Sequence, residues 1–93
     1  MTLNIGIYVF DDVEVLDFAG PYEVFTTATR MHSRNSRDDK PLFNVFTVGG
    51  STAPVRARAG LKVDPDYSIH DHPGMDCLIV PGGVITAELD KKD

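Results

Sequence analysis

The chain has 93 residues, of which 42% are hydrophobic and 25% are charged, and its formal net charge is −5. This length suits one domain, and the excess of acidic residues argues against electrostatic binding to nucleic acid or to an anionic membrane. A single cysteine, Cys77, excludes an internal disulfide, and no secretory signal or transmembrane run is visible, so we expect a cytoplasmic protein.

The first forty residues predict a strand, a turn, a helix and a loop. The apolar run at 5–10 (IGIYVF) is typical of a strand buried on both faces of a parallel sheet. Pro21 suits the first turn of a helix, and the apolar residues after it keep helical spacing to about Met31. The polar stretch 32–41 predicts a surface loop.

The middle of the chain predicts a second strand and a small hairpin. Residues 43–48 predict a second strand, which ends at a Gly-Gly-Ser turn. Residues 55–59 alternate apolar and charged side chains, and after Gly60 the segment 61–63 could return as an antiparallel partner. The Asp-Pro-Asp sequence at 64–66 is typical of a turn.

The last third predicts one more core strand. Residues 67–75 look irregular, with one short helical turn, and the apolar run at 76–80 predicts a third strand. Residues 84–92 lean towards a helix. The order of these elements predicts an α/β fold with a mostly parallel sheet and a small β-hairpin insertion.

The third strand ends in Pro81-Gly82-Gly83, which indicates a tight loop with accessible backbone N–H groups. Open α/β sheets carry their ligand sites in loops at the carboxyl ends of parallel strands. Asp17 also follows the carboxyl end of a predicted strand. We therefore expect Asp17 and the diglycine to lie at the same edge of the sheet.

Four segments in this order and spacing resemble the ThiJ/PfpI family of the class I glutamine amidotransferase-like superfamily: 5–10, 15–25, 60–68 and 76–83. The resemblance implies a flavodoxin-like sandwich, of which residues 1–93 would be the N-terminal portion of a single domain. Members of this branch are usually homodimers, and the first helix or the hairpin could supply the contact surface. The nucleophilic cysteine of the family would lie beyond residue 93, so we expect the isolated chain to be inactive.

The resemblance gives Asp17 a role beside the nucleophilic sulfur. A carboxyl that is partly shielded from water can keep its proton near neutral pH and can move protons to and from a substrate. The alternative for Asp17 is an N-terminal helix cap. Gly20, three residues later, is predicted to allow close packing of strand against helix.

Three further residues complete the predicted catalytic set. Gly82 and Gly83 could offer backbone N–H groups to a developing oxyanion, or they could simply form a turn that needs positive φ. Glu23 could reach the site, or it could stabilise the first helical turn.

Two other features suggest chemistry but have simpler explanations. Cys77 lies within an apolar strand, where a free cysteine acts as a small buried apolar residue. His70 and His72 have metal-ligand chemistry, but no third ligand is evident and the segment suits an exposed loop. We predict neither a bound metal nor a cofactor.

These observations leave more than one function open. The first is the N-terminal portion of a cysteine-dependent hydratase or amidase-like enzyme for a small molecule, because the Leu-Asp-x-x-Gly-Pro sequence at 16–21 is most similar to the isocyanide hydratase branch. The second is the effector-sensing domain of an AraC-type transcription regulator, which shares that sequence. A stress-related chaperone or deglycase is a third possibility within the wider family.

Overall fold

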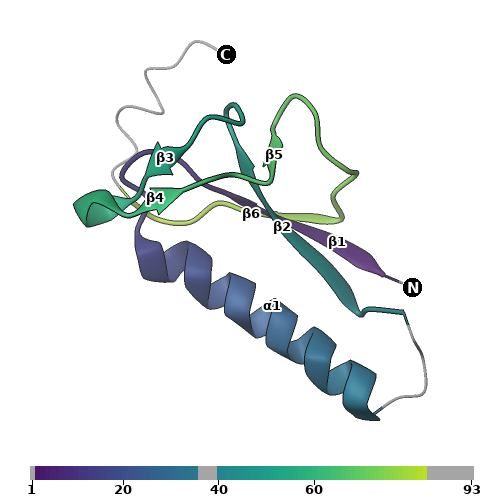
Figure 1. The fold of residues 1–93 in the computed structure, drawn as a ribbon. Coiled ribbons are helices and arrows are strands. Elements are labelled where there is room, and N and C mark those ends of the chain that lie inside the picture. The colour runs from purple at the N-terminus through teal and green to yellow at the C-terminus, as the bar shows by residue number, and fades with distance from the viewer. Residues whose placement is uncertain (1, 36–39, 84–93) are drawn as a thin grey trace.

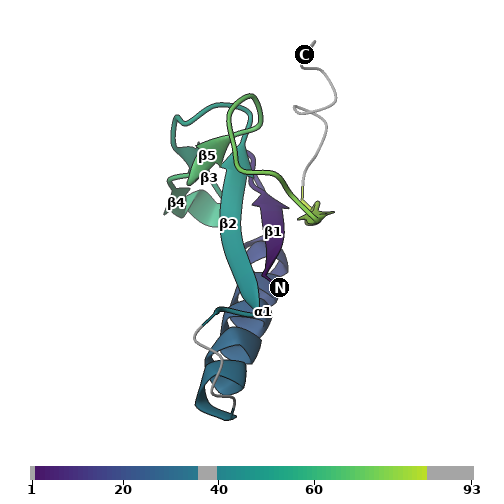
Figure 2. The ribbon, with the colours of Figure 1, turned by 90° about the vertical axis from the view of Figure 1, so that its right-hand side faces the viewer.

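Four parallel strands form the main sheet of this computed structural model, which describes residues 2–35 and 40–83. The strands are β1 (Leu3–Tyr8), β2 (Phe43–Gly49), β5 (Tyr67–Ser68) and β6 (Cys77–Ile79), in the order β5-β2-β1-β6. Figures 1 and 2 show β1 and β2 side by side at the centre of the molecule. The predicted α/β architecture with a mostly parallel sheet is confirmed.

The apolar run at 5–10, which begins within β1, explains the central place of this strand. Ile5 lies between Val45 of β2 and Cys77 of β6 in the register of the sheet, and Ile7 is fully buried. Only a strand covered on both faces and flanked on both edges can bury such a run. The buried apolar side chains are those of Ile5, Ile7, Val9, Phe10, Val13, Phe46, Val48 and Ala57.

The helix α1 (Val15–Asn35) covers one face of the sheet. Phe25 packs edge-on against Phe43, with ring centroids 4.9 Å apart, and the Thr29 hydroxyl accepts the Phe43 N–H at 3.2 Å. Figures 1 and 2 show the helix on one side of β1 and β2. These contacts join the helix to the start of β2.

The prediction that placed Pro21 in the first helical turn is wrong, because α1 begins six residues earlier, at Val15. Pro21 has no N–H to donate to the Asp17 carbonyl, but the helix continues through this missing bond. The prediction for Gly20 is also wrong. A Cβ at Gly20 would meet nothing within 4 Å, so this glycine does not serve close packing among the described residues.

The predicted hairpin is present but short. β3 (Val55–Arg56) pairs antiparallel with β4 (Lys62–Val63), and the 3-10 turn η1 (Arg58–Gly60) lies between them. The hairpin forms a separate two-stranded sheet beside the segment that connects β1 to α1 (Figure 1).

Two differences concern the last third of the chain. Tyr67 and Ser68 were predicted to be irregular, but they form β5 along β2, where Tyr67 packs edge-on against Phe46. The third predicted strand, β6, is present as an edge strand of the described sheet. The predicted helix at 84–92 lies outside the described residues. No helix in the described ranges has the length and apolar character needed to cross a membrane.

Candidate active site at the carboxyl edge of the sheet

The structure brings the Asp17 side chain next to the diglycine bend. Asp17 is the third residue of α1, and its N–H donates to the Glu14 carbonyl at 3.1 Å. A Cβ placed on Gly82 would lie 2.9 Å from Asp17 Oδ2. The two residues are 65 positions apart in the chain, and they meet because β1 and β6 are parallel and end at the same edge.

The connection between β1 and α1 holds the diglycine in place. Val13 and Gly83 form an antiparallel bridge, and the Glu14 N–H donates to the Gly82 carbonyl at 3.0 Å. Gly83 has a φ of +155°, and a Cβ there would lie 2.7 Å from the Asp12 carbonyl oxygen. Glycine is required at 83 by this close approach of two backbones. At 82 a side chain would displace only the end of the Asp17 side chain.

The site offers two kinds of polar group. Within residues 2–35 and 40–83, no group donates a hydrogen bond to the Asp17 carboxylate, and none accepts the N–H of Gly82 or Gly83. Asp17 is exposed rather than shielded by the described residues. It is not the N-cap of α1, although a negative charge in the first turn is favourable there. A carboxylate beside backbone donors can transfer protons and stabilise developing negative charge.

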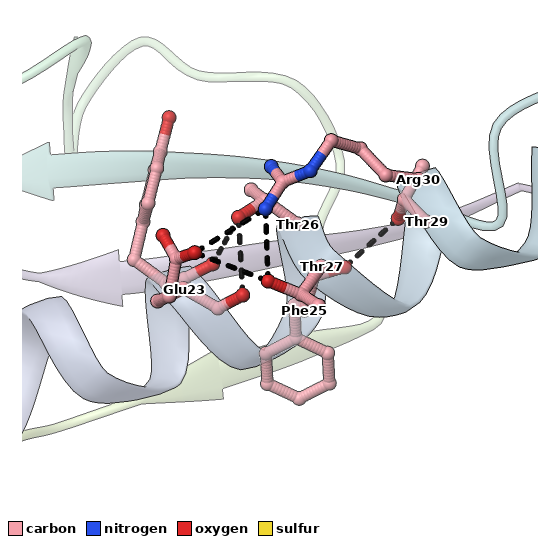
Figure 3. A network of polar contacts seen from close by, with 7 residues as sticks. Glu23, Phe25, Thr26, Thr27, Thr29 and Arg30 are labelled. Atoms are coloured by element: carbon pink, nitrogen blue, oxygen red, sulfur yellow. Dashed lines mark hydrogen bonds and ion pairs between the residues drawn. The ribbon is translucent and has the colours of Figure 1, made fainter.

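Glu23 does not join this pair. It lies six residues further along α1, about 9 Å along the helix axis. Its Oε1 accepts hydrogen bonds from Arg30 at 3.2 Å and from the Thr27 hydroxyl at 3.1 Å, on an exposed face of the helix. Figure 3 shows the Glu23 carboxylate among these threonine and arginine side chains. Glu23 does not stabilise the first helical turn either, because it belongs to the third.

An open groove of about 350 Å³ lies between α1 and the segments around β2 and β4. It is lined by Phe18, Ala19, Tyr22, Glu23, Thr47, Val63, Asp64 and Asp66. Asp17 and the diglycine are not among the lining residues, so the groove is separate from the site above. The groove was not predicted from the sequence, because local patterns indicate a turn at 64–66 but do not place that turn against the helix.

Asp66 is fixed on the wall of this groove. Its Oδ2 accepts the Thr47 N–H at 2.9 Å and the Thr47 hydroxyl at 3.2 Å. The Thr47 hydroxyl also accepts the Asp66 N–H at 2.9 Å. Because Thr47 is buried, this reciprocal contact fastens the turn at 64–66 to the centre of the sheet.

The prediction that Cys77 is buried is wrong. Its thiol is exposed, because β6 has only one neighbouring strand in the described sheet. Cys77 pairs with Ile5, in the middle of β1, whereas the diglycine follows the carboxyl end of β6. The exposed thiol is therefore not part of the Asp17 site.

The histidine segment adds no metal site. The Nδ1 atom of His72 lies 2.7 Å from the Pro73 carbonyl oxygen, and His70 is exposed. Across the described ranges, no group of three or more His, Cys, Asp or Glu side chains is arranged to hold a metal ion.

The fold and the site together define a parallel α/β protein with a candidate acid–base centre where β1 and β6 end. The sequence profile of the DJ-1/PfpI family matches residues 4–93. The chain belongs to this family, as the resemblance to ThiJ/PfpI proteins implied.

Individual relatives agree with this assignment. The chain is 32% identical over 83 residues to the isonitrile hydratase of Pseudomonas putida, covering 89% of this chain and 31% of that protein. It is 28% identical over 81 residues to the HTH-type transcriptional regulator GbdR of Pseudomonas aeruginosa, covering 87% of this chain and 20% of the regulator.

A solved structure shows the same fold. The crystal structure of a ThiJ/PfpI family protein from Pseudomonas syringae superposes with a TM-score of 0.70 at 24% identity, covering 89% of this chain and 30% of that one. The chain thus spans about a third or less of the length of these three proteins.

Proposed function

We propose that this chain is the N-terminal portion of a cysteine-dependent hydratase that acts on a small molecule, with an isonitrile as its substrate. The observation that carries the proposal is the Asp17 carboxylate beside Gly82 at the carboxyl edge of the sheet. The similarity to an isonitrile hydratase supports the choice of substrate. A cysteine outside residues 1–93 would supply the nucleophile, because Cys77 lies away from this edge.

The proposed reaction adds water to an isonitrile and yields an N-substituted formamide. The Asp17 carboxylate takes the proton of the cysteine thiol, the sulfur adds to the terminal carbon and forms a C–S bond, and Asp17 passes that proton to the carbon. Water then adds to the carbon of the C=N bond of the resulting thioimidate, and Asp17 moves a proton from the water to the nitrogen. As the C–S bond breaks, Asp17 transfers the hydroxyl proton of the adduct to the leaving sulfur, which releases the formamide and restores the thiol.

The diglycine would act in the second half of this reaction. Water addition creates a tetrahedral adduct whose oxygen carries developing negative charge. The N–H groups of Gly82 and Gly83, which have no acceptor among the described residues, would donate to such an oxygen. Backbone donors that are already held in place stabilise this charge without reorganisation.

The test is product formation by the full protein to which these residues belong. The protein is incubated with an alkyl isonitrile, and the corresponding formamide is quantified by NMR. The proposal predicts catalytic formamide production that is lost when the protein's thiols are blocked with iodoacetamide. Isonitrile that remains unchanged in the presence of the folded full protein would refute it.

A second candidate function is effector sensing without turnover, as in a transcription regulator. The separate groove between α1 and the 63–66 segment favours this candidate, because its volume suits a small molecule and its lining does not include Asp17. The similarity to an HTH-type regulator is consistent with it. Reversible binding of a small molecule by a full protein that also binds DNA, with no chemical change, would support sensing over catalysis.

A further inference from the structure

The segment 11–14, which connects β1 to α1, is the middle of three backbone segments that run side by side. On one side it bonds to the diglycine, through the Val13–Gly83 bridge and the Glu14 N–H. On the other side it bonds to the β3–β4 hairpin, which Figure 1 shows beside the start of α1. The 11–14 segment thus lies between the hairpin and the diglycine and is hydrogen-bonded to both.

The hairpin contributes three hydrogen bonds in which backbone groups take part. The Asp12 N–H donates to the Arg56 carbonyl at 2.7 Å, and the Arg58 N–H donates to the Val13 carbonyl at 2.9 Å. The Arg56 N–H donates to Asp11 Oδ1 at 3.0 Å. The Asp11 side chain therefore accepts the Arg56 N–H, which no backbone carbonyl of the 11–14 segment accepts.

Two further contacts join the hairpin to the segment. Val13 and Ala57 are buried in one cluster with Phe10, so their apolar contact is protected from water. Arg58 and Glu14 form an ion pair at 3.1 Å, with both side chains about half exposed. An exposed pair of this kind contributes little, so the hydrogen bonds and the buried cluster carry most of the connection.

The segment includes one residue in a less common backbone conformation. Asp12 has a φ of +67°, in the left-handed region, which aspartate adopts more readily than most other non-glycine residues. Bonds on both sides hold the segment in place. Movement of the segment would change the Glu14 bonds to Gly82 and to the Asp17 N–H together, since the Glu14 N–H and carbonyl make one each.

We propose that the β3–β4 hairpin positions the Asp17–diglycine site, and that Asp11 is a positioning residue through its hydrogen bond to the Arg56 N–H. Asp11 acts on the site through the 11–14 segment and does not touch the reacting atoms. The effect on catalysis rests on the proposed hydratase function, whereas the effect on backbone order does not.

The first test measures amide hydrogen exchange by NMR in the full protein to which these residues belong. Asp11→Ala removes the acceptor, whereas Asp11→Asn keeps an oxygen in the same place. We expect Asp11→Ala to speed exchange at Glu14 and Arg58 roughly three- to tenfold, the range expected for one hydrogen bond, and Asp11→Asn to restore most of the protection. The Val9 amide, which donates to the Val48 carbonyl, should not change.

Asp71→Ala is the matched control, because Asp71 is an exposed aspartate away from the hairpin. An equal effect of Asp71→Ala, or none of Asp11→Ala, would overturn the proposal. If Asp11→Ala does not fold, Asp11→Ser replaces it, because its shorter side chain weakens the hydrogen bond to the Arg56 N–H. It should raise exchange at Glu14 about twofold, and unchanged exchange would count against the proposal.

The second test measures isonitrile turnover by the full protein. Asp11→Ala should lower kcat about tenfold with KM nearly unchanged, and Asp11→Asn should recover most of the loss. If Asp17→Asn abolishes turnover while Asp11→Ala leaves kcat unchanged, the positioning role fails and the hydratase function stands. If no variant or wild-type protein turns over isonitrile, the hydratase function fails, and the exchange experiment still decides whether the hairpin orders the segment.

Discussion

The Asp17 carboxylate lies against the Cα of Gly82, in space that a side chain at position 82 would occupy. A Cβ at position 82 would lie 2.9 Å from Asp17 Oδ2. The relationship joins the first turn of α1 to the loop after β6. It explains why a side chain is disfavoured at 82 without reference to backbone conformation, because Gly82 is not among the glycines with positive φ.

Gly82→Ala should therefore impair the site without unfolding the chain. The added methyl group would displace the end of a flexible side chain, so we expect a change in unfolding free energy below about 0.5 kcal/mol. Turnover by the full protein should fall roughly tenfold, because the carboxylate is moved from its place. Urea unfolding and steady-state kinetics measure the two effects.

Gly20→Ala is the matched control for this substitution. Gly20 is inside α1 with open space around its Cα, so alanine should stabilise the protein by about 0.5–1 kcal/mol and leave turnover unchanged. Equal turnover by Gly82→Ala and Gly20→Ala would show that the approach of Asp17 to Gly82 has no catalytic consequence.

Gly83→Ala, unlike Gly82→Ala, should lower the stability of the fold. Its Cβ would lie 2.7 Å from the Asp12 carbonyl oxygen, a backbone atom that cannot move aside alone, and φ is +155°. We expect a loss of about 1–3 kcal/mol in unfolding free energy, measured by urea denaturation. A variant as stable as the wild type would mean that the two backbones do not approach as described.

The architecture was predictable where local sequence decides the outcome. β1 and β2 are rich in apolar, β-branched and aromatic residues, and their place in a parallel sheet follows from that pattern. The meeting of Asp17 with the diglycine was also predictable, because the ends of parallel strands share one edge. The start of α1 was missed because Pro21 resembles a first-turn residue, although a helix can continue through one missing N–H.

Other features depend on tertiary neighbours that no local pattern reports. Cys77 is followed in the sequence by apolar residues, which is typical of a buried strand. Its exposure is decided instead by the position of β6 at the edge of the described sheet. The two-residue strand β5 is too short to leave a periodic signal. The bonds of Asp11 to the hairpin also link residues far apart in the chain. Homodimer formation and a cytoplasmic location stay predictions.

The exposure of Cys77 has a direct consequence for thiol chemistry. As the single cysteine of the 93-residue chain, it should react fully with a thiol reagent such as DTNB under native conditions. Absorbance of the released thiolate measures the extent of reaction. Labelling that needs urea would show that the thiol is buried, as the sequence pattern alone indicated.

Asp66 should matter for stability through its contact with Thr47. Asp66→Ala leaves the buried Thr47 N–H without its acceptor, so we expect a loss of about 1–3 kcal/mol in unfolding free energy. Asp66→Asn keeps a side-chain oxygen and should lose less than half as much. Equal stability of the two variants in urea denaturation would show that the Asp66 carboxylate is not a required partner of Thr47.

The central claim concerns the chemical role of Asp17, and the most direct measurement is kcat for isonitrile hydration by the full protein carrying Asp17→Asn. The account predicts a loss of about 10²- to 10⁴-fold, the range typical of a group that transfers protons in the transition state. Asp71→Asn, an exposed control, should keep its rate. An Asp17→Asn protein that hydrates isonitrile within twofold of the wild-type rate would contradict the account.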